Sequence, residues 1–183
     1  LGALLLVRYS IEQGYFGPGA RIFMGLVLAV ALIAAGEWLR RKERAAGDAP
    51  SAAANIPAVL TAAGAVAAFG AIYAAYALYE FIGPAFAFVA LGATGVACMF
   101  AAALHGPALA GLGLVGSLAT PLLVSTNNPN PWALTIYLAV VSGASYGLAH
   151  VRRWLWLAVA TSVGAAIWSV GYISSLHGAL GTS

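Results

Sequence analysis

Two small groups of residues in this chain have types and spacings that could do chemistry. In the first, Glu80 follows Tyr73 and Tyr76 at helical spacings, so on one continuous helix the three side chains share a face. A carboxyl in the poorly hydrated last turn of a membrane span is a candidate for ligand binding or proton exchange. The alternative is that Glu80 only reaches the water beyond the turn at Gly83.

The second group is formed by Arg8, Glu12 and Arg21, which lie near the ends of two apolar segments. Arg8 and Glu12 are four residues apart and face the same way if a helix continues through them. Together with Arg21 they could bind an anionic or zwitterionic group at the outer membrane interface. We favour an interfacial ion pair that orients the turn, because basic side chains commonly extend to the interface at helix ends.

Residues for metal, redox or triad chemistry do not form a recognisable set. The three histidines are far apart without metal-ligand spacing, Cys98 is the only cysteine, and Asp48 is the only aspartate. We therefore expect no catalytic residue, no metal and no cofactor in this segment. Whether the whole protein is an enzyme stays open, although we expect that this segment is not.

The composition indicates an integral membrane protein. Hydrophobic residues make up 62% of the 183 residues and charged residues only 7%, whereas a soluble domain has about 25% charged residues. This excludes a soluble domain, a disordered tail and a nucleic-acid-binding protein. The uncharged run between Glu80 and Arg152 would be about 105 Å long as one helix, so it must fold back into about three crossings.

Proline after glycine or asparagine marks four helix starts, because proline fits the first helical turn. We predict an all-α polytopic transmembrane helix bundle over residues 1–183, with six complete spans plus part of a seventh. The partial span is Leu1–Val7. The complete spans are Pro18–Leu39, Ile56–Tyr79, Pro84–Leu104, Pro107–Val124, Pro131–Ala149 and Trp154–Leu176.

Small and hydroxylated residues inside these spans suggest how the helices pack. Gly113 and its neighbouring glycines favour close helix contact, and Thr120-Pro121 predicts a kink. Hydroxyls on the last two spans either line a polar cavity or make hydrogen bonds to other helices and to the preceding turn. They belong to Ser142, Ser145, Tyr146, Ser162, Ser169 and Tyr172.

The basic residues predict the orientation. They concentrate in a hydrophilic loop, residues 40–55, and at residues 150–153, and counting crossings puts both loops on the same side. Because short basic loops stay in the cytoplasm, we expect both to be cytoplasmic in a bacterial inner membrane and to contact lipid head groups. Glu37 is expected to pair with Arg40 or Arg41. The basic residues are Arg40, Arg41, Lys42, Arg44, Arg152 and Arg153.

Several motifs resemble the start of the membrane region in a bacterial "predicted membrane protein" family, the domain-of-unknown-function family numbered 2339. They include Val7-Arg8-Tyr9-Ser10-Ile11-Glu12, Gly36-Glu37-Trp38-Leu39, Phe81-Ile82-Gly83-Pro84, His105-Gly106-Pro107-Ala108 and Asn130-Pro131-Trp132-Ala133. The resemblance implies a fragment of a longer protein with more spans. It implies no activity and no catalytic residues.

Two functions remain open on this basis. The first is a non-enzymatic envelope protein that binds lipid or organises a complex. The alternative is a transporter or lipid-handling protein with a polar cavity near Glu80. In either case the expected partners are membrane lipids, other membrane subunits or the remainder of the chain, and not nucleic acid.

Overall fold

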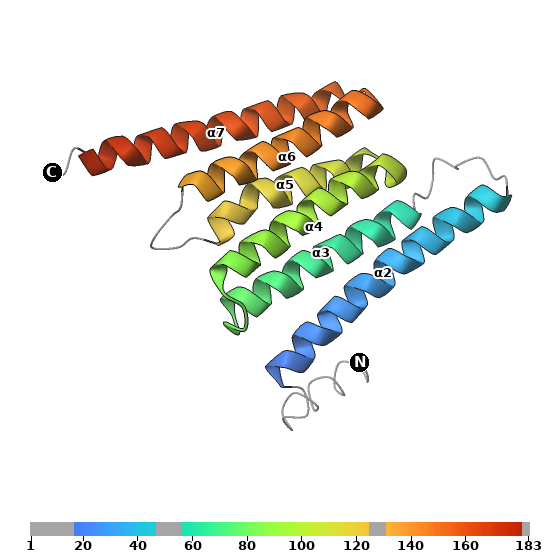
Figure 1. The fold of residues 1–183 in the computed structure, drawn as a ribbon. Coiled ribbons are helices and arrows are strands. Elements are labelled where there is room, and N and C mark those ends of the chain that lie inside the picture. The colour runs from blue at the N-terminus through green and yellow to red at the C-terminus, as the bar shows by residue number, and fades with distance from the viewer. Residues whose placement is uncertain (1–16, 47–55, 125–130, 181–183) are drawn as a thin grey trace. The chain divides into compact units, whose positions relative to one another are not determined.

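The computed structural model describes residues 17–46, 56–124 and 131–180, and within these ranges the regular structure is entirely helical. Figure 1 shows the helices, which succeed one another along the chain. They are α2 (Pro18–Ala46), α3 (Ile56–Ala77), α4 (Pro84–His105), α5 (Pro107–Leu123), α6 (Pro131–Arg152) and α7 (Leu155–Leu180). The all-α class is therefore confirmed for the described residues, and the partial span at Leu1–Val7 lies outside them.

The helix starts follow the proline signals. α2, α4, α5 and α6 each begin at a proline, whose missing N–H falls where no helical partner exists. Gly106 precedes α5 with φ 108°, a left-handed conformation that favours glycine. The chain can therefore turn directly from α4 into α5.

Helix α2 is longer than the sequence analysis expected, because it continues from Leu39 through Ala46. Glu37 holds the added turns by ion pairs to Arg40 at 2.5 Å and to Arg41 at 2.7 Å, at helical spacings of three and four residues. Residues 40–46 of the expected 40–55 loop are therefore helical, and residues 47–55 lie outside the described part. The predicted pairing of Glu37 is confirmed with both arginines.

Five of the described helices are long and apolar enough to cross a membrane: α2, α3, α4, α6 and α7. The expected count of six complete spans is not confirmed, because α5 has only 17 residues. At 1.5 Å per residue it is about 25 Å long, at the lower end of what the hydrocarbon core requires.

The chain divides into two compact units, Leu1–Leu91 and Gly92–Ser183, so that α4 contributes to both. In the first unit, α2 and α3 lie side by side (Figure 1). A Cβ added at Gly36 would lie 2.5 Å from Thr61 Oγ1, and one at Gly64 would lie 2.8 Å from the carbonyl oxygen of Ala29. Glycine is therefore required at both crossings.

In the second unit the same close packing joins the second half of α4 to α5. A Cβ added at Gly113 would lie 2.7 Å from the carbonyl oxygen of Gly95 and 3.0 Å from the Cβ of Cys98. This confirms that Gly113 allows close helix contact. Elsewhere in this unit α5, α6 and α7 pack against one another.

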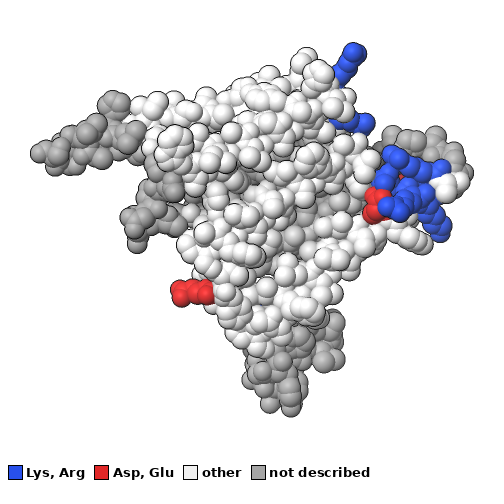
Figure 2. Space-filling view, viewed as in Figure 1, with Lys and Arg blue, Asp and Glu red and all other residues white. Residues whose placement is uncertain are grey.

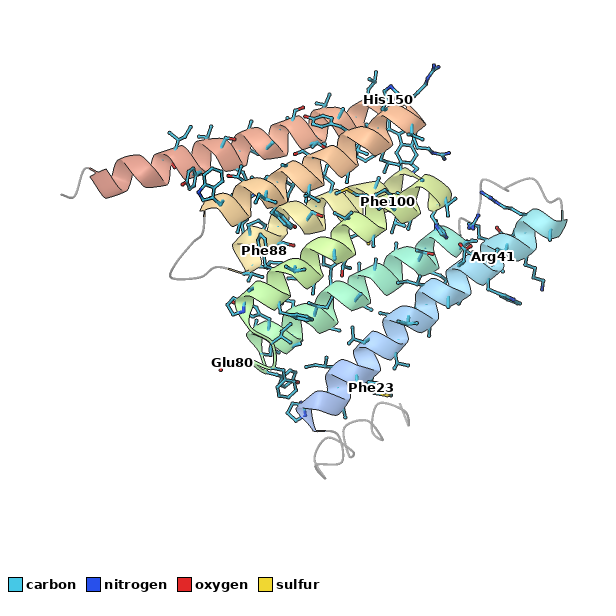
Figure 3. All side chains as sticks on the ribbon, in the orientation of Figure 1. Phe23, Arg41, Glu80, Phe88, Phe100 and His150 are labelled. Carbon is cyan, nitrogen blue, oxygen red and sulfur yellow. The ribbon has the colours of Figure 1, made fainter. Side chains whose placement is uncertain are left out.

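Large apolar side chains point away from the packed helices. Phe23 and Phe100, labelled in Figure 3, are 66% and 68% exposed, and Val170 on α7 is 67% exposed. Side chains of this kind have no polar partner and are stable when the surrounding solvent is hydrocarbon. These exposed apolar faces are suited to a hydrocarbon environment.

Candidate functional site

Glu80 does not share a helix face with Tyr73 and Tyr76, because α3 ends at Ala77. After α3 the chain forms a turn with two backbone hydrogen bonds that each span more residues than a helical bond does. The N–H of Tyr79 donates to the Ala74 carbonyl at 3.2 Å, and the N–H of Phe81 donates to the Ala75 carbonyl at 2.9 Å. Glu80 itself has φ 50° and is exposed. In Figure 3 it lies at the turn, pointing away from the helices.

The two tyrosines stay within α3, where both are half-buried. Tyr73 and Tyr76 are one turn apart and, with Glu80 outside the helix, they form a phenolic pair without a carboxylate on the same face. The helical spacing that suggested the group therefore holds for two of its three members.

Arg21 of α2 approaches the turn that holds Glu80. Its Nη1 is 3.4 Å from the hydroxyl oxygen of Tyr79, at the long limit of a hydrogen bond. The ring of Tyr79 stacks on Phe81 with centroids 5.8 Å apart. The structure thus brings Arg21 and the Glu80 turn to the same end of the first unit, whereas Arg8 and Glu12 lie outside the described residues.

The basic end of α2 is a compact charged cluster, visible as adjacent blue and red atoms in Figure 2. Arg41, labelled in Figure 3, contacts Glu37, while the ammonium group of Lys42 lies 5.3 Å from the ring centroid of Trp38. Arg44 is in the last turn, where a cation interacts favourably with the helix dipole. This end of α2 is suited to the membrane surface rather than to its interior.

The end of α6 has a comparable arrangement of its own. Arg153 adopts φ 55° and the N–H of Trp154 donates to the Ala149 carbonyl at 3.0 Å, the pattern of a Schellman closure. Arg152 lies over the Trp154 ring, 5.4 Å from its centroid. Sequence analysis placed these two arginines in a loop, and the structure places Arg152 at the helix end and Arg153 in the closing turn.

A shallow groove lies between α6 and α7 in the second unit. It encloses about 260 Å³ and is open on one side. Hydroxyl, phenol and indole groups interrupt its otherwise apolar wall. The lining residues are Leu134, Thr135, Leu138, Ala139, Ser142, Ala165, Trp168, Ser169 and Tyr172.

The hydroxyls of the last two spans divide between the two roles that the sequence left open. Ser142, Ser169 and Tyr172 line the groove. Tyr146 and Ser162 bind each other across α6 and α7 at 2.8 Å, and Ser145 bonds to the Val141 carbonyl at 2.8 Å. The predicted hydrogen bonds therefore occur, whereas the groove that three of these residues line is mostly apolar rather than a polar cavity.

Backbone carbonyls near the end of α5 anchor the neighbouring helices. Pro121 has no N–H to donate to Ser117, and the Ser117 carbonyl instead accepts a hydrogen bond of 2.8 Å from the Tyr137 hydroxyl of α6. The next carbonyl, of Leu118, accepts a 3.1 Å hydrogen bond from the Trp168 indole of α7. Thus α5 holds both α6 and α7.

Sequence analysis missed Trp168 and Tyr137 as anchoring residues. One signal was present: a proline inside a span frees the carbonyl four residues earlier, which in lipid must find another donor. The identity of the donor could not be found this way, because it depends on which helix packs against α5.

Within the described part of the chain, no three His, Cys, Asp or Glu residues lie close enough together to hold a metal ion. His105, at the end of α4, has its Nδ1 at 3.1 Å from the Ala101 carbonyl. Cys98 is buried.

Long apolar helices, exposed apolar faces and charges at helix ends define an integral membrane protein that crosses the membrane several times. A family model described as "Predicted membrane protein (DUF2339)" matches residues 1–182, so the chain belongs to this family. The resemblance seen in the sequence is confirmed. No curated protein matches the chain, and no solved structure matches it.

Proposed function

We propose that the chain is a non-enzymatic scaffold of the bacterial cytoplasmic membrane, which binds lipids and further membrane helices through its exposed apolar faces. One observation carries this proposal. The charged residues of the described part lie in the first turn of α2, the last third of α2, the turn after α3 and the end of α6. The spans α3, α4, α5 and α7 contain none.

The described spans carry charged residues at their ends and none in their interiors, and this distribution supports anchoring in the membrane rather than transport. Proton and ion pathways through membranes are usually built from acidic, basic or histidine side chains inside the spans. Here the interior hydroxyls of Thr61, Thr120 and Thr161 bond to the carbonyl four residues earlier, at 2.7–2.9 Å. Such bonds satisfy these hydroxyls within their own helices and leave little polar surface for a solute.

The charge pattern also supports an orientation. The basic end of α2 and the end of α6 are the two concentrations of positive charge, and positive charge near span ends stays in the cytoplasm. We therefore place residues 40–55 and 150–153 on the cytoplasmic side, where their arginines and Lys42 meet anionic lipid head groups.

Solvent access near Glu80 tests the proposal. In liposomes, a cysteine introduced by Glu80→Cys should react rapidly with a water-soluble maleimide, because Glu80 is exposed. A cysteine introduced by Tyr76→Cys should react at least tenfold more slowly. The native Cys98 is buried and provides the background rate. Equal fast reaction at both introduced cysteines would contradict a dry scaffold.

The alternative is a transporter or lipid-handling protein with a polar site near Glu80. The approach of Arg21 to Tyr79 favours it, because a cation and an acid then flank one turn. This alternative requires fast labelling at position 76 and loss of solute or lipid flux in Glu80→Gln. The scaffold requires that Glu80→Gln and Arg21→Gln leave stability and assembly unchanged.

A further inference from the structure

The turn between α6 and α7 holds all the Asp, Glu, Lys and Arg residues of the second unit. The sequence contains no Asp or Glu after Glu80, and the only Lys or Arg residues in Gly92–Ser183 are Arg152 and Arg153. Both are exposed, and neither forms a hydrogen bond or an ion pair with any residue that the structure describes. His150, labelled in Figure 3, is in the last turn of α6 and supplies no negative charge. No acidic side chain of this unit can therefore balance the two positive charges.

The backbone around the two arginines is held in one conformation. Arg153 has φ 55°, and the N–H of Trp154 donates to the Ala149 carbonyl at 3.0 Å. The N–H of Leu157 then donates to the Trp154 carbonyl at 3.1 Å, so α7 follows directly. The guanidinium carbon of Arg152 lies 5.4 Å from the centroid of the Trp154 ring, a contact that attracts a cation without neutralising it. One short, closed turn thus carries both guanidinium groups.

Apolar side chains accompany the arginines in this turn. Val151 is 75% exposed and Leu155 is 81% exposed, and the rings of Trp154 and Trp156 have centroids 6.5 Å apart. Tryptophan is enriched at the level of the lipid head groups, and exposed aliphatic side chains are suited to hydrocarbon. A free phosphate ion would gain nothing from these apolar groups. The turn therefore suits an amphiphile that is anionic at one end and apolar at the other.

The end of α2 has more basic residues but less unpaired charge. Glu37 forms ion pairs with Arg40 at 2.5 Å and with Arg41 at 2.7 Å, and Glu43 lies among the remaining basic residues. A phosphate that approaches these arginines competes with a carboxylate that already accepts their hydrogen bonds. The number of basic residues thus favours α2 as an anion site, whereas the charge left without a counter-ion favours the turn after α6.

From these observations we propose that the turn between α6 and α7 is a selective binding site for an anionic glycerophospholipid. The guanidinium groups of Arg152 and Arg153 donate hydrogen bonds to the phosphate oxygens, for which their planar fork of N–H groups is well suited. A zwitterionic lipid fits less well, because no carboxylate of this unit can receive an ammonium group. This inference rests on the proposed function, since it specifies where the scaffold selects its lipid.

The lipid preference of the full chain tests the site. The chain is purified in detergent with equal amounts of phosphatidylglycerol and phosphatidylcholine, and the lipids that it retains are counted by native mass spectrometry. Arg152→Gln and Arg153→Gln should each lower the preference for phosphatidylglycerol about fivefold. Arg41→Gln removes the same charge from an exposed arginine that Glu37 already pairs, and it should lower the preference by less than about twofold. Equal losses in the three variants overturn the proposal.

A second measurement uses the native chain and does not depend on how a variant folds. Retained phosphatidylglycerol should resist an excess of inorganic phosphate at constant ionic strength, because the ion cannot use the apolar contacts of Val151 and Leu155. Release of the lipid by inorganic phosphate would assign the arginines to a soluble anion and overturn the lipid site. Equal retention of phosphatidylglycerol and phosphatidylcholine by the native chain would overturn it as well.

These outcomes are separable from failure of the proposed function. If the two arginine variants retain the native lipid preference while Tyr76→Cys labels slowly, the scaffold stands and the lipid site falls. If Tyr76→Cys labels fast while both arginine variants lose the preference, the scaffold falls and the lipid site stands.

Discussion

Removing the hydroxyl of Tyr137 tests whether α5 is held to α6 through a backbone carbonyl. The hydroxyl donates to the Ser117 carbonyl at 2.8 Å, which Pro121 leaves without its usual helical donor. The ring of Tyr137 lies so close to Gly92 that any Cβ there would collide with it. Tyr137→Phe keeps this ring contact and removes the hydroxyl, together with its hydrogen bond to the Ser117 carbonyl and its interaction with the Thr120 side chain.

The expected cost can be worked from two contributions. Hydrogen bonds between membrane helices are worth about 0.6 kcal/mol on average and up to about 1.7 kcal/mol. Ser117 is fully buried, so its carbonyl has no water to replace the lost donor, and a buried unpaired polar group costs about 1–3 kcal/mol. We expect Tyr137→Phe to lower the free energy of unfolding by about 1–2 kcal/mol.

The assay is reversible unfolding of the full chain in mixed micelles, followed by circular dichroism as the denaturing detergent fraction rises. Ser117→Ala is the matched control at the same site. The Ser117 hydroxyl is buried and makes no hydrogen bond with any described residue, so its removal should change the unfolding free energy by less than about 0.5 kcal/mol. A loss in Ser117→Ala as large as that in Tyr137→Phe would refute the reasoning, because the side chain and not the carbonyl would then be the partner.

A double-mutant cycle makes the test sharper. Pro121→Ala restores the N–H that a helix would donate to the Ser117 carbonyl. In that background Tyr137→Phe should cost at least about 0.5 kcal/mol less than in the native chain. Purely additive effects would show that Pro121 and the Tyr137 hydroxyl act independently. This result would contradict their shared role at the Ser117 carbonyl.

Three further predictions concern the first unit, and each is measured by unfolding or amide exchange in micelles. Gly36→Ala should lower the free energy of unfolding by about 1–3 kcal/mol, because its Cβ would lie 2.5 Å from Thr61 Oγ1. Gly70→Ala, where no atom lies within 4 Å of the added Cβ, should be neutral or stabilising. Equal effects of the two substitutions would contradict the packing argument. Glu80→Gly should stabilise by about 1 kcal/mol because it relieves a positive φ, and Glu80→Gln should not. Glu37→Gln should lose about 0.5–1 kcal/mol from its two ion pairs and speed exchange in residues 40–46 at low salt, and unchanged exchange there would show that the pairs do not hold the helix.

Helix existence and most helix starts could be predicted from the sequence because lipid leaves the backbone few choices. An apolar segment must satisfy its own hydrogen bonds, so Pro84, Pro107 and Pro131 mark starts that the structure reproduces. The contact at Gly113 was predictable for a related reason, since helices in lipid associate by close approach of small residues. Membership of the family followed from short motifs spread along the chain.

Helix ends were harder to predict, and with them the candidate site. The apolar run of α2 ends near Leu39, but the helix continues to Ala46 because Glu37 pairs with the arginines that follow. Conversely, α3 stops at Ala77, before Glu80, which its helical spacing from Tyr73 and Tyr76 had placed on the same helix. Apolarity sets where a span crosses the membrane, whereas ion pairs and turn geometry set where the helix stops.

The two units solve the same packing problem by different means. Between helices in lipid there is no hydrophobic driving force, so contact must come from close approach or from hydrogen bonds. α2 and α3 use close approach, with glycine at Gly36 and Gly64. The second unit has the Gly95–Gly113 contact as well, but it fastens α6 and α7 to α5 by Tyr137 and Trp168 on carbonyls near a proline. Added side-chain volume at these glycines should therefore damage both units, whereas the second unit should in addition be sensitive to the loss of a single hydrogen-bond donor.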